Sequence, residues 1–303
     1  MSASPTTVIF TLTGNLLAER TLEFSDWAAG HTQRAQRESF QVGGKGINVS
    51  KMLQRLGVPT TALCFTGGAT GTECAQWLSR QKFASHIFPT VNATRIGVVV
   101  RGGSQPETTF FSPDAAPDAA ALCACADYLD ALPRGSVLSL CGSIPGWSTP
   151  DFDPLRAALT RWLAHSPLCA DTYGPPLAWF ASQPLALVKI NATELRTLFP
   201  TEPATAQVPA LLKLAAGRSP ARRWIVTDGA GPVWFQEGTG EPASLTPPRV
   251  TEVSPTGSGD VLFACVLDAQ FRRGKSLAES VAQALPYASA NAAHPGVADF
   301  PLP

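Results

Sequence analysis

The stretch Pro255-Thr-Gly-Ser-Gly-Asp260, followed by the apolar run Val-Leu-Phe-Ala-Cys-Val-Leu267, is the most informative part of this 303-residue sequence. The run is apolar on every side, which is typical of a helix buried inside a large core. The two glycines let the preceding backbone approach a ligand closely and take unusual dihedral angles. Because free N–H groups and the positive end of the dipole meet at a helix N-terminus, the junction predicts an anion-binding site.

Asp260 stands at the start of this expected helix, where a carboxylate would repel a bound phosphate. A carboxylate has a use there if it accepts the proton of an attacking hydroxyl, as a general base does. The alternative is that Asp260 only caps the helix, as aspartate often does. The motif by itself leaves both interpretations open.

A second glycine-rich segment, Gly43-Gly-Lys-Gly-Ile-Asn48, leads into an expected helix from Ile47 to Leu56. Lys45 and Asn48 would offer a cation and an amide to sugar hydroxyls or to a phosphate. An ordinary junction between a loop and a helix is the alternative. The segment matches neither the phosphate-loop pattern G-x-x-x-x-G-K-[ST] nor the dinucleotide pattern G-x-G-x-x-G, so it does not indicate those two kinds of site.

Short apolar runs alternate with amphipathic stretches along most of the chain. The runs cover residues 8–12, 61–66, 95–100, 108–111, 137–141, 168–170, 185–190 and 224–227. This alternation predicts an α/β fold with a largely parallel sheet and helices on both of its faces. We expect ligands beyond the carboxyl ends of the strands, where Gly142, Asp171, Asn191 and Asp228 end four of the runs.

Two connecting regions carry expectations of their own. The polar region that follows the first run, up to Phe40, is expected to be irregular. Arg101-Gly-Gly-Ser104 has the composition of a hairpin turn between the runs on either side of it.

The bulk composition excludes several classes of protein. Hydrophobic residues make up 45% of the chain and charged residues 15%, so a large core can form. A formal net charge of zero argues against a nucleic-acid or anionic-membrane partner held by bulk electrostatics. The seven cysteines are scattered, which predicts buried thiols in a reducing compartment. No apolar run approaches the ~18 residues of a membrane span or resembles a signal peptide, so we expect a cytoplasmic protein.

The two glycine-rich motifs, in this order, resemble the two signatures of the PfkB/ribokinase family of sugar kinases. Gly-Gly-Lys-Gly-Ile-Asn-Val is most similar to the branch that acts on phosphosugars, such as 1-phosphofructokinase and tagatose-6-phosphate kinase. The resemblance extends over nearly the whole chain through four further segments: Cys141-Gly-Ser-Ile-Pro145, Val188-Lys-Ile-Asn-Ala-Thr-Glu194, Ile225-Val-Thr-Asp-Gly-Ala-Gly231 and Ala290-Asn-Ala-Ala-His-Pro-Gly296. It implies one ribokinase-like domain over residues 1–303, with three layers α/β/α and a small β-sheet lid from approximately 13–42 and 93–111.

The resemblance also implies an activity: ATP-dependent phosphoryl transfer to a hydroxyl of a small carbohydrate, with a phosphosugar favoured as acceptor. It makes Asp260 the catalytic base, and it makes the backbone amides of Gly257, Ser258, Gly259 and Asp260 the anion hole. ATP and Mg²⁺ are the implied cofactors, and a homodimer formed through the lid is the implied assembly. A non-phosphorylated sugar or a nucleoside as acceptor, and a non-catalytic binding protein, remain as alternatives. An oxidoreductase using a nicotinamide cofactor would fit the α/β pattern but lacks its fingerprint.

The implied binding residues divide into two sets. Gly43, Gly44, Lys45, Asn48 and Arg95 would line the sugar site, with Arg95 near the phosphate that the substrate already carries; a solvated arginine at a strand end is the alternative. Residues implied beside the nucleotide are Lys189, Asn191, Thr227, Asp228, Gly229 and Asn291. Asn191 and Glu194 would hold Mg²⁺ through waters, and they also have the spacing of a helix capping box. Asp171 could hydrogen-bond the substrate or support the site.

The sequence departs from the family pattern in the half that would read the sugar. Family members carry an aspartate just after the first strand, and Leu17 falls at that position, with Asn15 and Glu19 nearby as possible substitutes. The segment Thr109-Phe-Phe-Ser-Pro-Asp114 also lacks the family pattern N-x-P-G. These changes bear on the identity of the acceptor far more than on the type of reaction.

Overall fold

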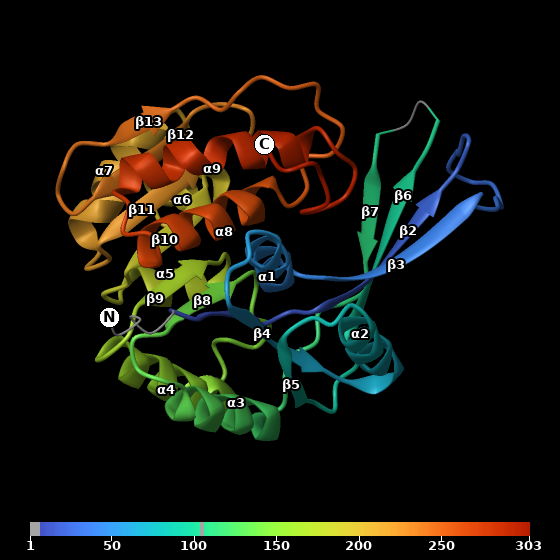
Figure 1. Ribbon diagram of the computed structural model, residues 1–303, viewed down its shortest axis with the longest axis horizontal. Helices are drawn as coiled ribbons and strands as arrows, with labels where there is room; N and C mark the ends of the chain where they lie inside the picture. Colours follow the sequence, from blue (N-terminus) through green and yellow to red (C-terminus); the bar gives the residue numbers. More distant parts are fainter. Residues whose placement is uncertain (1–6, 104–105) are drawn as a thin grey trace.

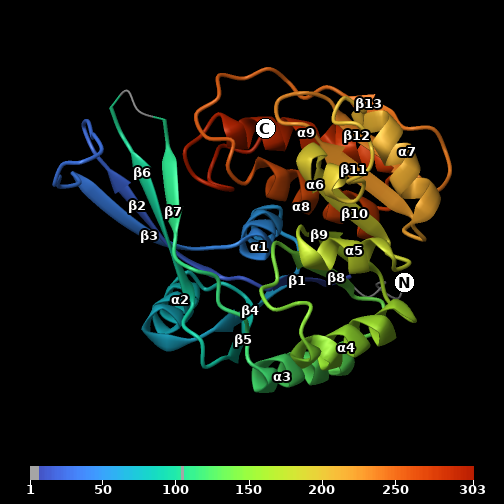
Figure 2. The same cartoon turned by 180° about the vertical axis from the view of Figure 1, so that it is seen from behind.

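Two β-sheets and the helices around them make up residues 7–103 and 106–303, the part of the chain that this computed structural model describes (Figure 1, Figure 2). The strands are β1 (Ile9–Thr13), β2 (Leu17–Glu23), β3 (Arg37–Gly43), β4 (Thr60–Thr66), β5 (Ser85–Pro89), β6 (Arg95–Arg101), β7 (Thr108–Phe111), β8 (Val137–Cys141), β9 (Leu168–Asp171), β10 (Leu187–Asn191), β11 (Arg223–Thr227), β12 (Val233–Glu237) and β13 (Ala243–Leu245). The helices are α1 (Lys45–Arg55), α2 (Gly68–Arg80), α3 (Ala119–Ala131), α4 (Asp153–Leu163), α5 (Pro175–Ala181), α6 (Ala192–Thr197), α7 (Val208–Arg218), α8 (Ser258–Phe271) and α9 (Leu277–Ala292), with a short 3-10 helix, η1 (Pro150–Phe152).

The larger sheet has nine strands in the order β13-β12-β11-β10-β9-β8-β1-β4-β5. Neighbours from β11 to β5 are parallel, which confirms the largely parallel sheet predicted from the sequence. At one edge β12 and β13 are antiparallel, and the apolar runs in the sequence did not indicate these two strands. The parallel arrangement brings the carboxyl ends of β1, β8, β9, β10 and β11 to the same side of the sheet.

Helices cover both faces of this sheet, so the fold has the three layers predicted from the family resemblance. Successive side chains of a strand point to opposite faces. Trp224 and Val226 of β11 accordingly lie in the core beneath α3, α4 and α7, while Ile225 lies in the core beneath α1, α8 and α9. In Figure 1, α3 and α4 lie below the sheet and α8 and α9 lie above it.

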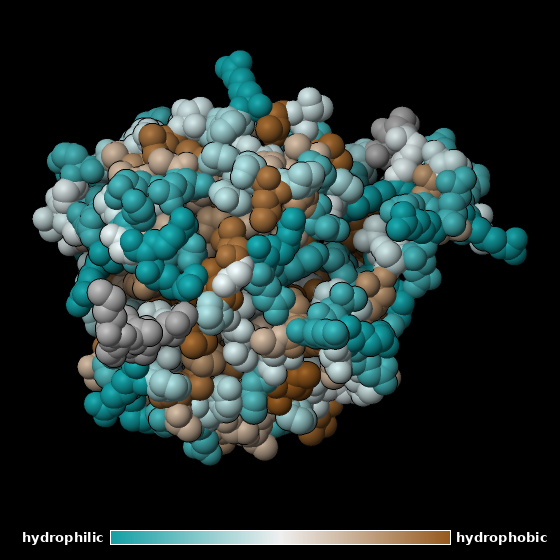
Figure 3. Space-filling model, viewed as in Figure 1, coloured by the Kyte–Doolittle hydropathy of each residue, from teal (hydrophilic) through white to brown (hydrophobic). Residues whose placement is uncertain are grey.

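The smaller sheet has four strands in the order β3-β2-β6-β7 and projects from the body of the molecule as a separate lobe (Figure 3). The expectation of an irregular region before Phe40 is wrong, because β2 and β3 lie there. Their residues are mostly exposed or half-buried, so no apolar run marks them. Backbone pairing defines them instead, since β2 is bonded on both sides. β6 and β7 form the expected antiparallel pair; Ser104 of the expected turn lies outside the described residues.

Two smaller observations complete the description. Cys123 is exposed on α3, so the prediction that the cysteines are buried holds for the other six and is wrong for this one. None of the helices in residues 7–103 and 106–303 combines the length and the apolar composition that crossing a membrane requires.

Candidate active site

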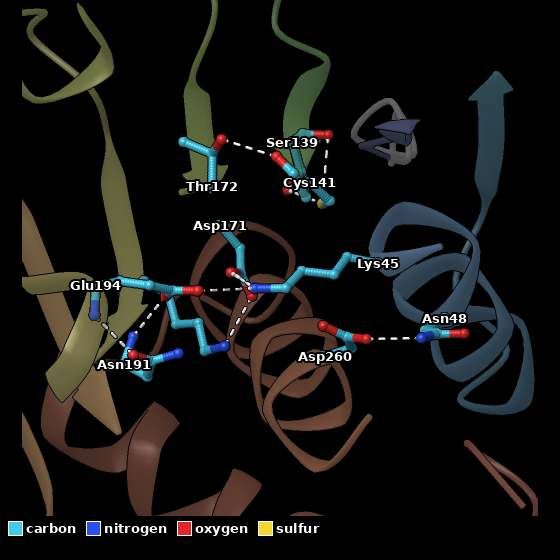
Figure 4. Close-up of polar contacts among 11 residues, drawn as sticks. Lys45, Asn48, Ser139, Cys141, Asp171, Thr172, Asn191, Glu194 and Asp260 are labelled. Carbon is cyan, nitrogen blue, oxygen red and sulfur yellow. Dashed lines mark hydrogen bonds and ion pairs between the residues drawn. The ribbon is translucent and has the colours of Figure 1, made fainter. Parts of the chain in front are cut away.

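Asp171, the last residue of β9, lies at the centre of a charged cluster at the carboxyl ends of the parallel strands (Figure 4). Its Oδ1 accepts from Lys45 Nζ at 2.7 Å, and its Oδ2 accepts from Lys189 Nζ at 2.7 Å. The carboxylate is fully buried. Burial by itself raises the pKa of Asp171, but the charges of Lys189 and Lys45 outweigh it and hold this pKa below its ordinary value. Asp171 is therefore a carboxylate that fixes two lysines at once.

Asp260 lies in the first turn of α8, and its side chain is turned toward the N-terminal part of α1. Its Oδ2 accepts a hydrogen bond of 2.7 Å from Asn48 Nδ2 (Figure 4). The alternative that Asp260 caps the helix is wrong, because the N-cap of α8 is Gly257 and no side chain caps it. Burial, together with the nearby charge of Asp171, raises the pKa of Asp260 to about 6, against the opposing influence of Lys45 and Lys189.

The backbone before Asp260 is closely packed, and it requires glycine at two positions. Gly257 has φ 77°, in the left-handed region that side chains rarely tolerate, and a β-carbon there would collide with Val297. A β-carbon on Gly259 would lie 2.6 Å from Lys189 Nζ. The ammonium of Lys189 therefore lies directly against Gly259 in the first turn of α8.

Lys45, the first residue of α1, connects the second glycine-rich segment to the cluster. Besides its bond to Asp171, its Nζ lies 3.5 Å from Glu194 Oε1 and 5.3 Å from the centre of the Tyr173 ring. Burial lowers the pKa of Lys45, but the three carboxylates of Asp171, Asp260 and Glu194 more than offset it and raise the pKa above its ordinary value. Lys45 is a permanent cation of the site. Gly43 and Gly44 precede it at the end of β3 and at the N-cap of α1.

Asn191 and Glu194 form a complete capping box at the start of α6. The backbone N–H of Glu194 donates to Asn191 Oδ1, and that of Asn191 donates to Glu194 Oε2, each at 2.8 Å. This confirms the capping-box interpretation and leaves Glu194 Oε1 directed toward the cluster. Residues 7–103 and 106–303 hold no group of three or more carboxylate, histidine or cysteine side chains able to enclose a metal. The donors present fit a Mg²⁺ ion that keeps most of its waters.

Arg95 forms a second polar group with Asn15, Asp114 and Ser143. Its Nη1 donates to Asp114 Oδ1 at 3.0 Å, and Asn15 Nδ2 donates to the same Oδ1 and to Ser143 Oγ, both at 2.9 Å. The Arg95 side chain is only 13% exposed and packs on the Phe111 ring, so the interpretation of Arg95 as a solvated strand-end arginine is wrong. We call Asn15, Arg95, Asp114 and Ser143 the Asn15 wall.

Leu17 and Glu19 lie on the face of β2 that also carries Gly43 of β3 and Arg95 of β6 in register. Leu17, at the position of the family's aspartate, is buried, and the β-carbons that Gly43 and Gly97 lack would contact it. The carboxylate of Glu19 accepts from Gln41 and lies close to Gly43. A carboxylate is therefore present on this face, two residues after the expected position.

The residues expected beside the nucleotide divide into two groups. Thr227 is half-buried and Asp228 and Gly229 are exposed in the turn after β11, where a ligand can reach them. Asn291 is fully buried: its Nδ2 donates to Thr256 O and Ser258 Oγ, and its Oδ1 accepts from the backbone of Ala298. The prediction that Asn291 contacts the nucleotide is corrected accordingly, because all of these side-chain groups hold the surrounding loops together.

The sequence underestimated the role of Asp171 and indicated no role for Asp114 and Ser143. The sequence indicates that Asp171 could bind the substrate or support the site, but not that it joins Lys45 to Lys189. Asp114 and Ser143 carried no predicted role, although Ser143 lies in the segment Cys141-Gly-Ser-Ile-Pro145 and its place after β8 was a usable signal. For Asp114 the only signal was a departure from the family pattern.

Comparison with known proteins identifies the family of this chain. The profile of the pfkB family carbohydrate kinases matches residues 12–303. The chain is 27% identical over 277 residues to a 1-phosphofructokinase of Borreliella burgdorferi, covering 90% of this chain and 88% of that protein. It is 27% identical over 288 residues to a D-tagatose-1-phosphate kinase of Bacillus licheniformis, covering 93% and 90%.

Solved structures share the fold. Phosphofructokinase-2 from Escherichia coli in complex with fructose-6-phosphate superposes with a TM-score of 0.85 at 23% identity, covering 94% of both chains. Ribokinase from Thermotoga maritima superposes with a TM-score of 0.72 at 17% identity, covering 97% of this chain and 96% of the other. Because the family profile spans almost the whole sequence, this chain belongs to the pfkB family of carbohydrate kinases.

Proposed function

We propose that this kinase transfers the γ-phosphoryl group of ATP to a hydroxyl of a phosphosugar, with Asp260 as the general base. The observation that carries the proposal is the position of Asp260, a buried carboxylate in the first turn of a helix that no side chain caps, with a pKa raised to about 6. A base works best when its pKa lies near the pH at which it operates.

The proposed reaction needs positioning and charge neutralisation more than covalent chemistry. The acceptor oxygen attacks the γ-phosphorus while Asp260 takes the hydroxyl proton, and the bond to the β-phosphate oxygen breaks to release ADP. The amides of Gly257, Ser258 and Gly259 would stabilise the charge on the transferred group. Asp171 fixes Lys189 and Lys45, and Lys189 adds positive charge against Gly259.

Asn191 and Glu194 would hold Mg²⁺ through its waters. The ion would neutralise charge on the phosphates of ATP when it is bound. Support comes from Glu194 Oε1, which the capping box leaves free and which points toward the charged cluster. Thr227, Asp228 and Gly229 line the adjoining strand end and would contact the nucleotide.

A phosphosugar acceptor is supported by the relatives and by one side chain. Of the two relatives described above, one is named a 1-phosphofructokinase and the other a D-tagatose-1-phosphate kinase. Arg95 places a guanidinium on the same face of the small sheet as Gly43 and Leu17, where it can meet an anionic acceptor. Gly43, Gly44, Lys45 and Asn48 form the opposite edge of this proposed sugar site.

The small sheet is proposed to act as a lid and as a dimer surface. The sheet comprises residues 17–23, 37–43, 95–101 and 108–111. At the end of β6, Arg101 Nη2 donates to Pro295 O at 2.8 Å, which connects the sheet to the segment that follows α9. On the face that does not carry Arg95, Ile96 and Phe110 are 39% and 57% exposed. Exposed apolar side chains on a sheet mark a surface that a second copy can cover.

An ADP-release screen with Mg-ATP tests the proposed reaction. The panel contains free sugars, ketohexose 1-phosphates, ketohexose 6-phosphates and nucleosides. We expect ADP release with at least one phosphosugar, well above the rate with its unphosphorylated parent. A free sugar or nucleoside as the best acceptor would refute the phosphosugar part alone, and no ADP release with any acceptor would refute the kinase.

A further inference from the structure

Resting on the proposed function, we infer that Asp114 is the carboxylate that accepts hydrogen bonds from the acceptor's hydroxyl groups. Asp114 would thereby supply, from another segment of the chain, the carboxylate that family members carry at the position of Leu17. The inference depends on three observations: how Asp114 is held, what Leu17 does instead, and which cavity Asp114 lines.

The carboxylate of Asp114 is fixed at one oxygen and available at the other. Oδ1 accepts from Asn15 Nδ2 at 2.9 Å and from Arg95 Nη1 at 3.0 Å. Asn15 is itself almost fully buried and is held by Ser143. In the part of the chain that the structure describes, no donor lies within hydrogen-bond distance of Oδ2, and half of the Asp114 side chain is exposed. A carboxylate oxygen oriented in this way can accept from a ligand hydroxyl without first reorganising.

Leu17 cannot perform this role. Its side chain is apolar and buried, and it lies over the α-carbons of Gly43 and Gly97. Arg95 is the register partner of Leu17 in β6. The bond from Arg95 to Asp114 therefore links this carboxylate to the residue that is paired with Leu17 in the neighbouring strand. Asp114 also follows Pro113 within the segment that departs from the pattern N-x-P-G, so the two departures in the sequence meet in space.

A cavity of about 360 Å³ lies against Asp114. Ser143, Trp147, Tyr173 and Pro175 are among its other lining residues. Asp114 and Ser143 belong to the Asn15 wall, so the cavity lies directly against that wall. It reaches the charged cluster only through Tyr173, whose ring centre lies 5.3 Å from Lys45 Nζ. Its size falls within the range of small-ligand sites, at the lower end. Apolar walls with a few fixed polar groups suit one sugar, because its CH groups can pack on the apolar walls and its hydroxyls can hydrogen-bond the polar groups.

Glu19 is the competing carboxylate. It lies beside Gly43, and Gln41 donates to it. We favour Asp114 because two donors of the site itself orient its carboxylate and because Asp114 lines the cavity. The experiment below includes Glu19 so that the two assignments are separated.

The test measures acceptor binding by calorimetry without nucleotide, and ADP release separately. The probes are ketohexose 1-phosphates and 6-phosphates, followed by the monodeoxy analogues of whichever binds. We expect Asp114→Ala and the isosteric Asp114→Asn to weaken binding about 10- to 100-fold, the loss that follows from one hydrogen bond to a charged group. The wild type should bind one of the monodeoxy analogues about 10- to 100-fold more weakly than the parent sugar phosphate. For that analogue, Asp114→Ala should weaken binding by less than roughly a further twofold, because the hydrogen bond is already absent. A role confined to holding Arg95 would not single out one hydroxyl.

Asp130→Asn is the matched control, because it removes a half-exposed carboxylate paired with Arg161 away from the site. Unchanged binding in both Asp114 variants refutes the inference. Tighter binding of phosphosugars also refutes it, since the carboxylate would then compete for Arg95. Loss of binding in Glu19→Gln, but not in Asp114→Asn, assigns the role to Glu19 instead. Binding that depends on Asp114 without ADP release supports the inference and refutes the kinase, whereas a wild type that binds no probe contradicts both.

Discussion

Asp260 carries a cost in the folded protein that a structural role does not explain. It is 5% exposed, lies near the carboxylate of Asp171 and has a pKa raised to about 6. Burial and the neighbouring carboxylate both disfavour the ionised form of Asp260. Strongly shifted groups of this kind gather at functional sites. Two predictions separate the catalytic role of Asp260 from a structural one.

The first prediction concerns turnover of the Asp260→Asn variant. The amide of the variant can still accept the hydrogen bond from Asn48, so we expect the fold to be kept. The amide cannot act as a base, because it does not take up a proton near neutral pH. We expect kcat to fall by about 10²- to 10⁴-fold, while binding of ATP, measured by fluorescence or calorimetry, changes little. In the wild type, kcat/KM, which reports the pKa of the free enzyme, should fall as the pH drops through about 6. Turnover within a factor of two of the wild type in the variant would remove Asp260 from the mechanism.

The second prediction concerns stability. The pKa of Asp260 is higher in the folded protein, about 6, than its ordinary value of 3.8. The folded state therefore holds this proton more tightly, so its contribution to stability is present at low pH and is lost as the pH rises to about 6. Asp260→Asn removes this cost, and we expect it to raise the free energy of unfolding by about 1–3 kcal/mol at pH 8 and by little at pH 4. Thermal unfolding of both proteins at the two pH values provides the measurement, and a loss of stability at pH 8 contradicts the assignment.

At the scale of elements, the same local motif appears twice with different surroundings. α6 and α9 both begin with a complete capping box, Asn191 with Glu194 and Ser276 with Glu279. The first faces Lys45 across 3.5 Å, and the second lies on the exposed surface. The cap alone explains why each glutamate occurs, but only the first one adds charge to the site.

This duplication provides a matched pair of variants. Glutamine at position 194 or 279 keeps an oxygen for the helix cap and removes the charge. We expect Glu194→Gln to raise the Mg²⁺ concentration for half-maximal rate about tenfold, in line with residues that act on a metal through its waters. Glu279→Gln should leave that concentration unchanged. Initial rates against free Mg²⁺ at fixed ATP give the comparison, and equal behaviour of the two variants would place Glu194 outside the metal site.

For the whole molecule, the two faces of the small sheet differ in the side chains that they carry. One of its faces carries Leu17, Glu19 and Arg95, and the other exposes Ile96 and Phe110. The division follows from strand geometry, because neighbouring side chains point to opposite faces. A single sheet can therefore cover a substrate with one face and contact a second copy with the other.

We accordingly predict that Phe110→Ser lowers the mass of the protein in solution from that of a dimer to that of a monomer. The exposed apolar area at the contact is lost, and a hydroxyl takes its place. Light scattering after size-exclusion chromatography measures the mass. Val91→Ser is the control, since Val91 is 84% exposed and lies outside the small sheet. A wild type that is monomeric at all concentrations contradicts the prediction.

The sequence by itself determined the buried strands, the polar residues that end them and the two glycine-rich helix starts. These features are local, since they depend on the alternation and composition of neighbouring residues. The residue pattern missed the half-exposed strands β2 and β3, which only the family resemblance implied, because backbone pairing and not an apolar run defines them. The capping box of Asn191 and Glu194 was predictable for the opposite reason, because its partners are three residues apart.

Only the tertiary structure decided which polar groups meet. Lys45 pairs with Asp171 across 126 positions, and Asn48 bonds to Asp260 across 212. Local propensity cannot encode such pairs, because the partners come together only after the parallel strands have aligned their carboxyl ends. The shifted pKa of Asp260 and the position of Asp114 beside Arg95 follow from this packing, since burial and neighbouring charge are properties of the folded chain.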